Sequence, residues 1–193
     1  MNDNKVEIIL DTDIGGDPDD FFALLWLLSQ DNIVIKAICC TPGRTSQVRF
    51  LSRLLLACKV SNIRLGFPSL RNIKEHHVND FHFNFLKSVN LSEECSSIEP
   101  EPADELLHEL FKCNPERLLL TIGPLTNIKQ FLKKYHSVEI KKSFTMEGYT
   151  DQNHNGFPFP DKFKGKQFVP AYNFIADRGA ARSFLDCDNI REK

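Results

Sequence analysis

Short apolar runs alternate with helical segments along most of this chain. Residues 6–10 and 33–40 are aliphatic runs of the kind found in strands that are buried on both faces. Each is followed by a segment with helical periodicity, at 18–29 and at 46–58. The same alternation predicts strands at 63–66, 117–121 and 143–146, and helices at 103–112, 125–135 and 178–185. The sequence therefore predicts an α/β fold with a central parallel or mixed sheet flanked by helices.

Two segments break this alternation. Residues 72–101 mix histidine and phenylalanine with polar residues, which predicts a long loop with one helical piece. Residues 151–170 are rich in glycine, proline and asparagine, which predicts a second irregular insertion. A chain of 193 residues suits one domain with its own core. We therefore interpret residues 1–193 as a single domain.

Charge and cysteine spacing exclude several function classes. The chain has 24 Lys and Arg against 26 Asp and Glu, a formal charge of -2, so no basic field indicates nucleic acid or an anionic membrane as a partner. It contains no apolar run long enough to span a bilayer, and its polar N-terminus is unlike a signal peptide, so we expect a cytoplasmic protein. The six cysteines lack a metal-binding spacing and are expected to be reduced, mostly buried thiols.

An acidic turn follows the first predicted strand. It holds five aspartates within ten residues: Asp11, Asp13, Asp17, Asp19 and Asp20. Capping of the next helix explains one or two of them. Five converging carboxylates raise one another's pKa unless protons or a cation compensate, and Ca²⁺ or Mg²⁺ prefers such oxygen ligands. The turn is thus either a metal site or a solvated acidic turn, at the sheet edge where α/β proteins bind ligands.

Two other functions fit this turn less well. A phosphate-binding loop is disfavoured, because the turn has neither the GxGxxG pattern nor a P-loop lysine, and its acid would repel phosphate. The Asp11-x-Asp13 pair resembles the opening motif of haloacid-dehalogenase-like phosphatases. That family has Thr or Val where this chain has Gly15.

Four segments together resemble the inosine/uridine-preferring nucleoside hydrolase family. Residues 11–20 (DTDIGGDPDD) resemble its N-terminal Asp-x-Asp signature, and 121–128 (TIGPLTNI) resemble its Gly-Pro-Leu-Thr-Asn-Ile segment. Residues 144–148 (FTMEG) resemble its Met-Gly-Gly strand end, and 172–177 (YNFIAD) its Asn-x-x-x-Asp segment. The four occur in the family's order over nearly the whole chain.

The resemblance implies a calcium-dependent hydrolase that acts on a small-molecule nucleoside or riboside. By analogy, Asp13 would bind Ca²⁺ and act as general base, Asp20 would be a bidentate ligand, and the carbonyl of Ile122 would complete part of the calcium shell. Asp19 and Asn173 would contact the ribose. These residue types suit the chemistry, because carboxylates stabilise an oxocarbenium-like state and a metal-held water needs only a modest base.

The chain departs from the family pattern at several positions. Asp11 would have a supporting role, and Asp17 is an additional acid, so the resemblance leaves open which of Asp17, Asp19 and Asp20 reaches the metal. Arg44 replaces an asparagine, and its charge must either point away from the metal or meet an anionic substrate. Ala171 replaces a glutamate that contacts the sugar. The family also continues into a C-terminal portion with a further Asp ligand and a His, so we expect this chain to be shortened there.

Histidines and phenylalanines in the irregular segments are weaker candidates. His76, His77 and His82 could touch a base or a metal, but we expect them on the surface. His154 could replace the missing acid, although a turn explains it equally. We expect the phenylalanines of residues 81–85 to pack the loop against the domain.

Two functions remain open. The first is calcium-dependent hydrolysis of the N-glycosidic bond of a ribonucleoside or related riboside. The second is a shortened, inactive homologue that binds calcium or a ribosyl ligand, or a fragment of a longer hydrolase. The sequence leaves a homo-oligomer open in both cases.

Overall fold

The computed structural model describes residues 5–68, 78–88, 99–146, 161–163, 165 and 171–193. Its strands form one sheet in the order β4-β3-β2-β1-β5-β6-β7, and every described pair is parallel. The strands are β1 (Val6–Thr12), β2 (Ile33–Cys40), β3 (Arg64–Phe67), β4 (Glu101–Pro102), β5 (Leu118–Thr121), β6 (Ile140–Thr145) and β7 (Ile190–Glu192). The predicted α/β class and flanked sheet are confirmed, and the described sheet is parallel rather than mixed.

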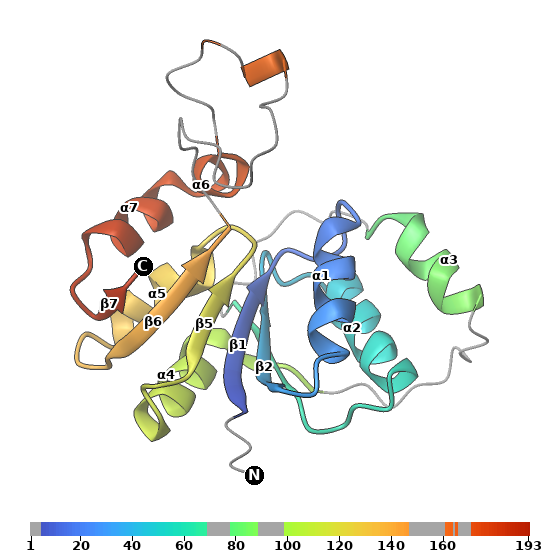
Figure 1. Ribbon diagram of the computed structural model, residues 1–193, viewed down its shortest axis with the longest axis horizontal. Coiled ribbons are helices and arrows are strands. Elements are labelled where there is room, and N and C mark those ends of the chain that lie inside the picture. Colours follow the sequence, from blue (N-terminus) through green and yellow to red (C-terminus); the bar gives the residue numbers. More distant parts are fainter. Residues whose placement is uncertain (1–4, 69–77, 89–98, 147–160, 164, 166–170) are drawn as a thin grey trace.

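Helices cover both faces of this sheet (Figure 1). One face carries α1 (Asp19–Leu28), α2 (Thr45–Ala57) and α3 (Asp80–Ser88), and the other carries α4 (Ala103–Cys113), α5 (Thr126–Lys134) and α7 (Arg178–Asp186). Strand β1 contributes side chains to the hydrophobic cores on both faces of the sheet. Ile8 and Leu10 pack with the first group of helices, whereas Ile9 packs with the second. All three side chains are at most 2% exposed. This explains why the strand sequence is apolar without alternation.

The order of the strands reverses at β1. From β1 the chain passes to β2, β3 and β4 on one side, and it then returns to place β5 on the other side of β1. The helices that follow β1 and β5 therefore lie on opposite faces of the sheet. In open parallel sheets, ligands bind beyond the carboxyl ends of the strands at such a reversal. The acidic turn lies at this position.

Three short elements were not predicted from the sequence. Strand β4 has two residues, one a proline, and pairs only with Gly66 and Phe67 of β3. Strand β7 buries only Ile190 and pairs with β6. Helix α6 (Tyr172–Ala176) buries only Asn173. None of them has an apolar pattern of its own. The two strands form because a neighbouring strand offers unpaired backbone groups, and proline is tolerated at a sheet edge.

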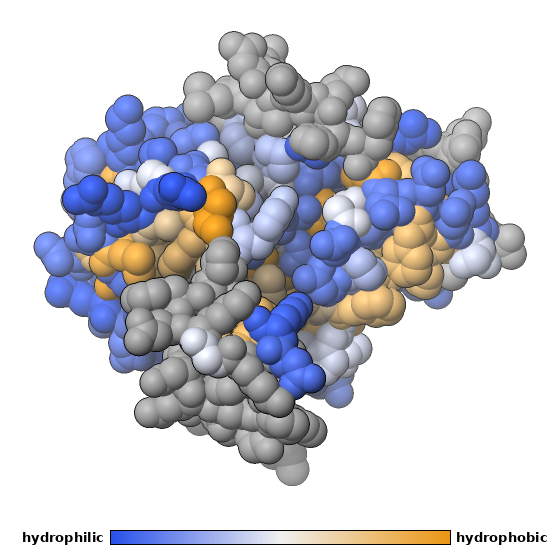
Figure 2. All heavy atoms as spheres, turned by 90° about the horizontal axis from the view of Figure 1, so that it is seen from above, coloured by the Kyte–Doolittle hydropathy of each residue, from blue (hydrophilic) through white to orange (hydrophobic). Residues whose placement is uncertain are grey.

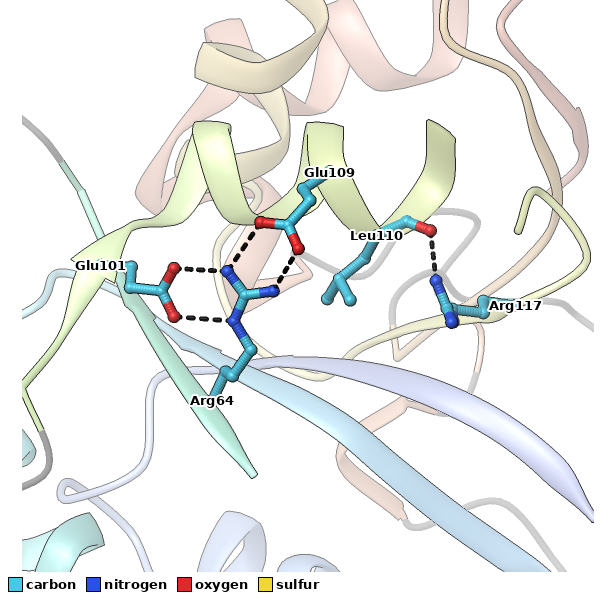
Figure 3. Close-up of polar contacts among 5 residues, drawn as sticks. All are labelled: Arg64, Glu101, Glu109, Leu110 and Arg117. Atoms are coloured by element: carbon cyan, nitrogen blue, oxygen red, sulfur yellow. Dashed lines mark hydrogen bonds and ion pairs between the residues drawn. The ribbon is translucent and has the colours of Figure 1, made fainter. Parts of the chain in front are cut away.

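Ion pairs tie the edge of the sheet to helix α4. The Arg64 guanidinium donates to Glu101 at 2.7 and 2.5 Å and to Glu109 at 2.7 and 2.8 Å (Figure 3). Arg117 is 7% exposed, donates to the Leu110 carbonyl in the last turn of α4, and pairs with Glu7 of β1 at 2.8 Å. These bidentate contacts link β3, β4 and α4.

The aromatic residues of α3 pack it onto α1 and α2, as predicted for 81–85. His82 is different from the prediction, because it lies in a helix and has no exposed surface. Its ring meets those of Phe21 and Phe50 edge-on at 5.7 and 5.0 Å. Residue 82 and Leu86 are four positions apart, so the helix turns both toward the core. His76, His77 and His154 lie outside the described residues.

The cysteines only partly follow the prediction. Cys39 and Cys40 are buried in β2, Cys58 and Cys187 are half-buried, and Cys113 is exposed. All five are free thiols, and Cys95 lies outside the described residues. Among the described residues, no helix has the length and apolar character needed to cross a membrane.

Candidate active site

The turn between β1 and α1 brings the acidic residues to the carboxyl end of the sheet. It bends at Gly15, whose φ of +122° is a conformation that side chains disfavour, and a Cβ there would lie 2.9 Å from Val78. The Gly15 carbonyl accepts a hydrogen bond from Asn79 N at 2.8 Å, and Ile14 N donates to Thr12 Oγ1 at 3.1 Å. The turn is therefore held from both sides.

Asp13 and Asp20 form a carboxyl pair. Their side chains are hydrogen-bonded to each other, and Asp20 is 6% exposed. Burial, followed by the hydrogen bond and charge of Asp13, raises the pKa of Asp20 to about 8. Burial also raises the pKa of Asp13, and the nearby charges of Asp19 and Asp17 act in the same direction. Without a cation, Asp20 therefore keeps a proton and donates it to the Asp13 carboxylate.

The other predicted acidic residues lie around this pair. Asp17 and Asp19 are exposed, and Asp19 begins α1. Of the three acids that follow Gly16, it is Asp20 that contacts Asp13. Neither exposed acid lines the cavity described below.

Asp11 lies behind the pair and points to the opposite face of the sheet. It has no exposed surface, and its Oδ1 accepts a hydrogen bond from Asn127 Nδ2 at 2.8 Å, while its Oδ2 has no hydrogen-bond partner. Burial raises the pKa of Asp11 to about 8. The same Asn127 amide donates to Thr41 Oγ1 at 2.9 Å. Asn127 thereby joins the ends of β1 and β2 to helix α5.

Ile122 and Asn173 meet at the next strand end. Asn173 is 6% exposed, and its Nδ2 donates to the Ile122 carbonyl at 2.9 Å. Gly123 allows this turn to lie against the acidic turn, because a Cβ at that position would be 2.9 Å from Asp13 Oδ1 and 2.5 Å from Asp13 N. The Ile122 carbonyl is thus brought to the end of β1 that carries Asp13.

A cavity of about 490 Å³ opens beside Asp13. Its walls come from the turns after β1, β2 and β5, from the start of α2, and from Val78 and α6, and its lining residues are Asp13, Gly15, Gly16, Thr41, Pro42, Arg44, Gln47, Val78, Pro124, Thr126, Tyr172 and Ala176. Figure 2 views the molecule from this side, where hydrophilic side chains predominate around smaller apolar areas. The volume is typical of sites for small organic ligands.

Gln47 was not predicted as a site residue, although it organises one wall of the cavity. It is 3% exposed, and its Oε1 accepts hydrogen bonds from Gly43 N and Arg44 N at 3.1 and 3.0 Å. Its Nε2 donates to the carbonyls of Ile14 and Thr41 at 2.9 and 3.1 Å. In the sequence, Gln47 is marked only by its position in the first turn of a predicted helix that follows a glycine. A residue that merely caps the helix would occupy the same position.

Arg44 lies on the cavity wall, at the start of α2. Its side chain is half-buried, and its buried Nε has no hydrogen-bond partner. Burial lowers the pKa of the guanidinium. Within the described residues, no carboxylate is ion-paired with it. Arg44 therefore brings a positive charge to the wall of the cavity.

The chemistry of the acidic pair fits a hard cation only in part. Two carboxyl groups that share a proton can share a cation instead, and the turn that carries the Ile122 carbonyl lies against Asp13. However, no group of three or more His, Cys, Asp or Glu side chains within the described residues is placed to hold a metal. Calcium takes six to eight oxygens, so backbone, water or ligand oxygens would have to supply the rest.

Comparison with known proteins identifies the family. Residues 8–191 match the model of the inosine-uridine preferring nucleoside hydrolase. The chain belongs to this family. No curated protein sequence matches it. Family membership explains why the four motif segments occur in one order, and three of them are now seen to lie at strand ends or next to the cavity.

Solved nucleoside hydrolases share the fold at low identity. The inosine-uridine preferring enzyme of Bacillus anthracis gives a TM-score of 0.70 at 18% identity, over 95% of this chain and 62% of that one. A plant nucleoside hydrolase gives a TM-score of 0.68 at 20% identity, over 97% of this chain and 59% of that one. The purine-preferring ribonucleoside hydrolase of Gardnerella vaginalis gives a TM-score of 0.57 at 18% identity, over 74% of this chain and 49% of that one. This chain thus matches about half to three fifths of the length of these relatives.

Proposed function

We propose that this chain hydrolyses the N-glycosidic bond of a ribonucleoside or related riboside, with Asp13 as general base and Ca²⁺ as cofactor. The observation that carries the proposal is the Asp13–Asp20 pair, with Asp13 lining a cavity at the strand reversal of a chain from the nucleoside hydrolase family. Both the position and the residue types suit a glycosidic bond, whose cleavage builds positive charge on the sugar.

Asp13 is suited to accept a proton. Burial raises the pKa of Asp13 in the cation-free site, and a carboxylate with a raised pKa accepts a proton more readily than an exposed one. In the reaction, the oxygen of water bonds to C1′ of the ribose and the C1′–N bond breaks. Asp13 takes the proton from the water, and the nucleobase leaves with the bonding electron pair and takes a proton from solvent, to which Asp13 later returns its own.

Calcium would be held by Asp13, Asp20 and the Ile122 carbonyl. It would supply positive charge that lowers the pKa of a bound water and orients the ribose hydroxyls. Asp19 and Asn173 are proposed to contact the ribose, and Asp11 to support the turn from behind. Asn173 already holds the Ile122 carbonyl at 2.9 Å, so it also fixes that ligand. The ring of Tyr172 lines the cavity and offers a surface for a nucleobase.

A second candidate is a protein that binds calcium or a ribosyl ligand without turnover. Two observations favour it. Fewer than three acidic, His or Cys side chains of the described residues converge on the proposed metal. Ala171 also stands where the family has a glutamate that contacts the sugar.

Hydrolysis of p-nitrophenyl riboside tests the proposal, because its good leaving group needs little help from an acid. We expect turnover in Ca²⁺ that a chelator abolishes. Asp13→Asn should lower kcat by about 10²- to 10⁴-fold, the usual contribution of a general base. Asp31→Asn is the matched control, since Asp31 is exposed at the opposite end of the sheet. Folded wild-type protein that shows no turnover would leave only the second candidate.

A further inference from the structure

The lining of the cavity carries both an acid and a cation. The turn after β1 contributes Asp13, which is hydrogen-bonded to Asp20. The start of α2 contributes Arg44 and Gln47. A ligand in this space therefore meets both an acid and a cation. A neutral nucleoside can accept hydrogen bonds from the cation, but it carries no negative charge to offset it.

Arg44 is an unusual residue for the wall of a cavity that receives only neutral ligands. The guanidinium stays ionised in proteins, and its buried Nε has no hydrogen-bond partner. A buried donor that remains unpaired is costly, so an acceptor supplied by a ligand would recover that cost. The planar guanidinium matches the oxygens of a phosphate, to which it can donate two parallel hydrogen bonds.

The helix that carries Arg44 adds to the attraction. Helix α2 has 13 residues and begins directly after Arg44, so the positive end of its dipole points to the same region. The backbone N–H groups of Gly43 and Arg44 are already bound by Gln47 Oε1, whereas the buried Nε of Arg44 has no partner. Gln47 also holds the backbone of Arg44 in place.

We propose that Arg44 binds the phosphate of a phosphorylated riboside, so that the substrate is a nucleoside 5′-monophosphate or a similar sugar phosphate rather than a neutral nucleoside. This inference rests on the proposed function, because it concerns the same cavity. The acidic pair repels the phosphate and accepts ribose hydroxyls, while Arg44 attracts the phosphate. These two interactions together orient the ligand. The cavity volume of about 490 Å³ is within the range of small-ligand sites.

Binding measurements test this without requiring catalysis. Calorimetry in Ca²⁺ should show that wild-type protein binds ribose 5-phosphate at least ~10-fold more tightly than ribose. Arg44→Gln should lose ~10- to 100-fold in affinity for ribose 5-phosphate, as expected for a hydrogen bond to a charged group, and keep its affinity for ribose. Arg44→Lys should recover part of the loss. Arg49→Gln is the control, because Arg49 is exposed on the same helix. Equal binding of the two sugars by folded wild-type protein overturns the inference.

Two further arms separate this inference from the proposed function. If inosine is hydrolysed as well as inosine 5′-monophosphate and Arg44→Gln changes neither rate, the inference fails while the hydrolase function stands. If ribose 5-phosphate binds through Arg44 but neither compound is hydrolysed, the hydrolase function fails and the phosphate site stands. Inorganic phosphate that binds as tightly as ribose 5-phosphate would mean that the site recognises a free anion, which also overturns the assigned substrate class.

Discussion

Gln47 illustrates how much of the site depends on single buried polar residues. Its amide contacts the turns after β1 and β2 and the start of α2 at once. A hydrophobic side chain of similar size would fill the space but leave four backbone groups without this partner. Asn127 likewise bridges separate elements, because its amide donates hydrogen bonds to both Asp11 and Thr41. Such residues define the cavity although they do no chemistry.

Replacing Gln47 should therefore destabilise the protein strongly. We expect Gln47→Leu to lower the free energy of unfolding by ~2–4 kcal/mol, because each buried unpaired group costs about 1–3 kcal/mol and the site can relax in part. Chemical denaturation measures the change. Gln30→Leu is the control, since the Gln30 amide makes only exposed hydrogen bonds and its loss should cost less than ~0.5 kcal/mol. Equal effects of the two substitutions would contradict the role given to Gln47.

At the scale of elements, Asp177 joins two helices on one face of the sheet. It precedes α7 and accepts a hydrogen bond from Ala180 N at 2.9 Å, and it also accepts one from Thr126 Oγ1 of α5 at 3.0 Å. Lys129 of α5 lies 3.4 Å from it. This residue therefore caps α7 and holds it against α5 at the same time. The motif match at 172–177 located it without revealing the contact between the helices.

The stabilisation by Asp177 should depend on pH. Burial raises the pKa of Asp177, but the hydrogen bonds from Ala180 and Thr126 and the charge of Lys129 outweigh it, so the pKa is lowered on folding. The contribution is thus present above the unfolded pKa of about 4 and is lost as the pH falls through the folded pKa. Asp177→Ala should cost ~1–2 kcal/mol at pH 7, and the difference from wild type should shrink toward pH 3.

Thermal or urea unfolding of both proteins between pH 3 and 7 measures this dependence. Asp186→Ala is a suitable control, because Asp186 is exposed at the other end of α7, and its loss should change stability by less than ~0.5 kcal/mol at any pH. Asp177→Asn, which keeps the capping oxygen, should lie between wild type and the alanine variant. A cost of Asp177→Ala that stays constant from pH 7 to pH 3 would argue against a charge-dependent cap.

The helices and longer strands were predictable because each carries its own apolar pattern. The helix predicted at 103–112 is found at Ala103–Cys113, and the strand predicted at 33–40 is found with the same bounds. Strands β4 and β7 have no such pattern and exist only through pairing with their neighbours. The burial of His82 was not predictable for the same reason. It depends on packing against α1 and α2 and not on the polar residues next to it in the sequence.

At the scale of the whole molecule, calcium should act as a stabilising ligand. A ligand that binds only the folded state adds about 2.7 kcal/mol at a concentration 100-fold above its Kd. For a chain of this size, that corresponds to a rise in Tm of roughly 5–10 °C. A calcium-dependent hydrolase and an inactive calcium-binding homologue would both show this rise in Tm. Hydrolysis of p-nitrophenyl riboside distinguishes the two.

Differential scanning fluorimetry with Ca²⁺ and with a chelator measures the effect. Asp20→Asn should abolish the calcium-dependent part of Tm, because it removes one carboxylate of the pair that shares a proton. Asp31→Asn, which changes an exposed acid at the opposite end of the sheet, should retain it. A wild-type Tm that is the same in Ca²⁺ and chelator would rule out calcium as the cofactor. The homo-oligomer and the cytoplasmic location remain predictions.

The sequence by itself determined the parallel sheet, the place of the acidic turn at its carboxyl edge, and the family through four motif segments. These follow from local periodicity and from short contiguous patterns, which act over a few residues. Only the tertiary structure decided that Asp20 is the acid that contacts Asp13, and that Arg44 and Gln47 share the cavity. The hydrogen bonds that build the site join residues far apart in the chain, such as Gln47 and Ile14 or Asn127 and Asp11. They depend on how the ends of β1, β2 and β5 pack together, which no local pattern contains.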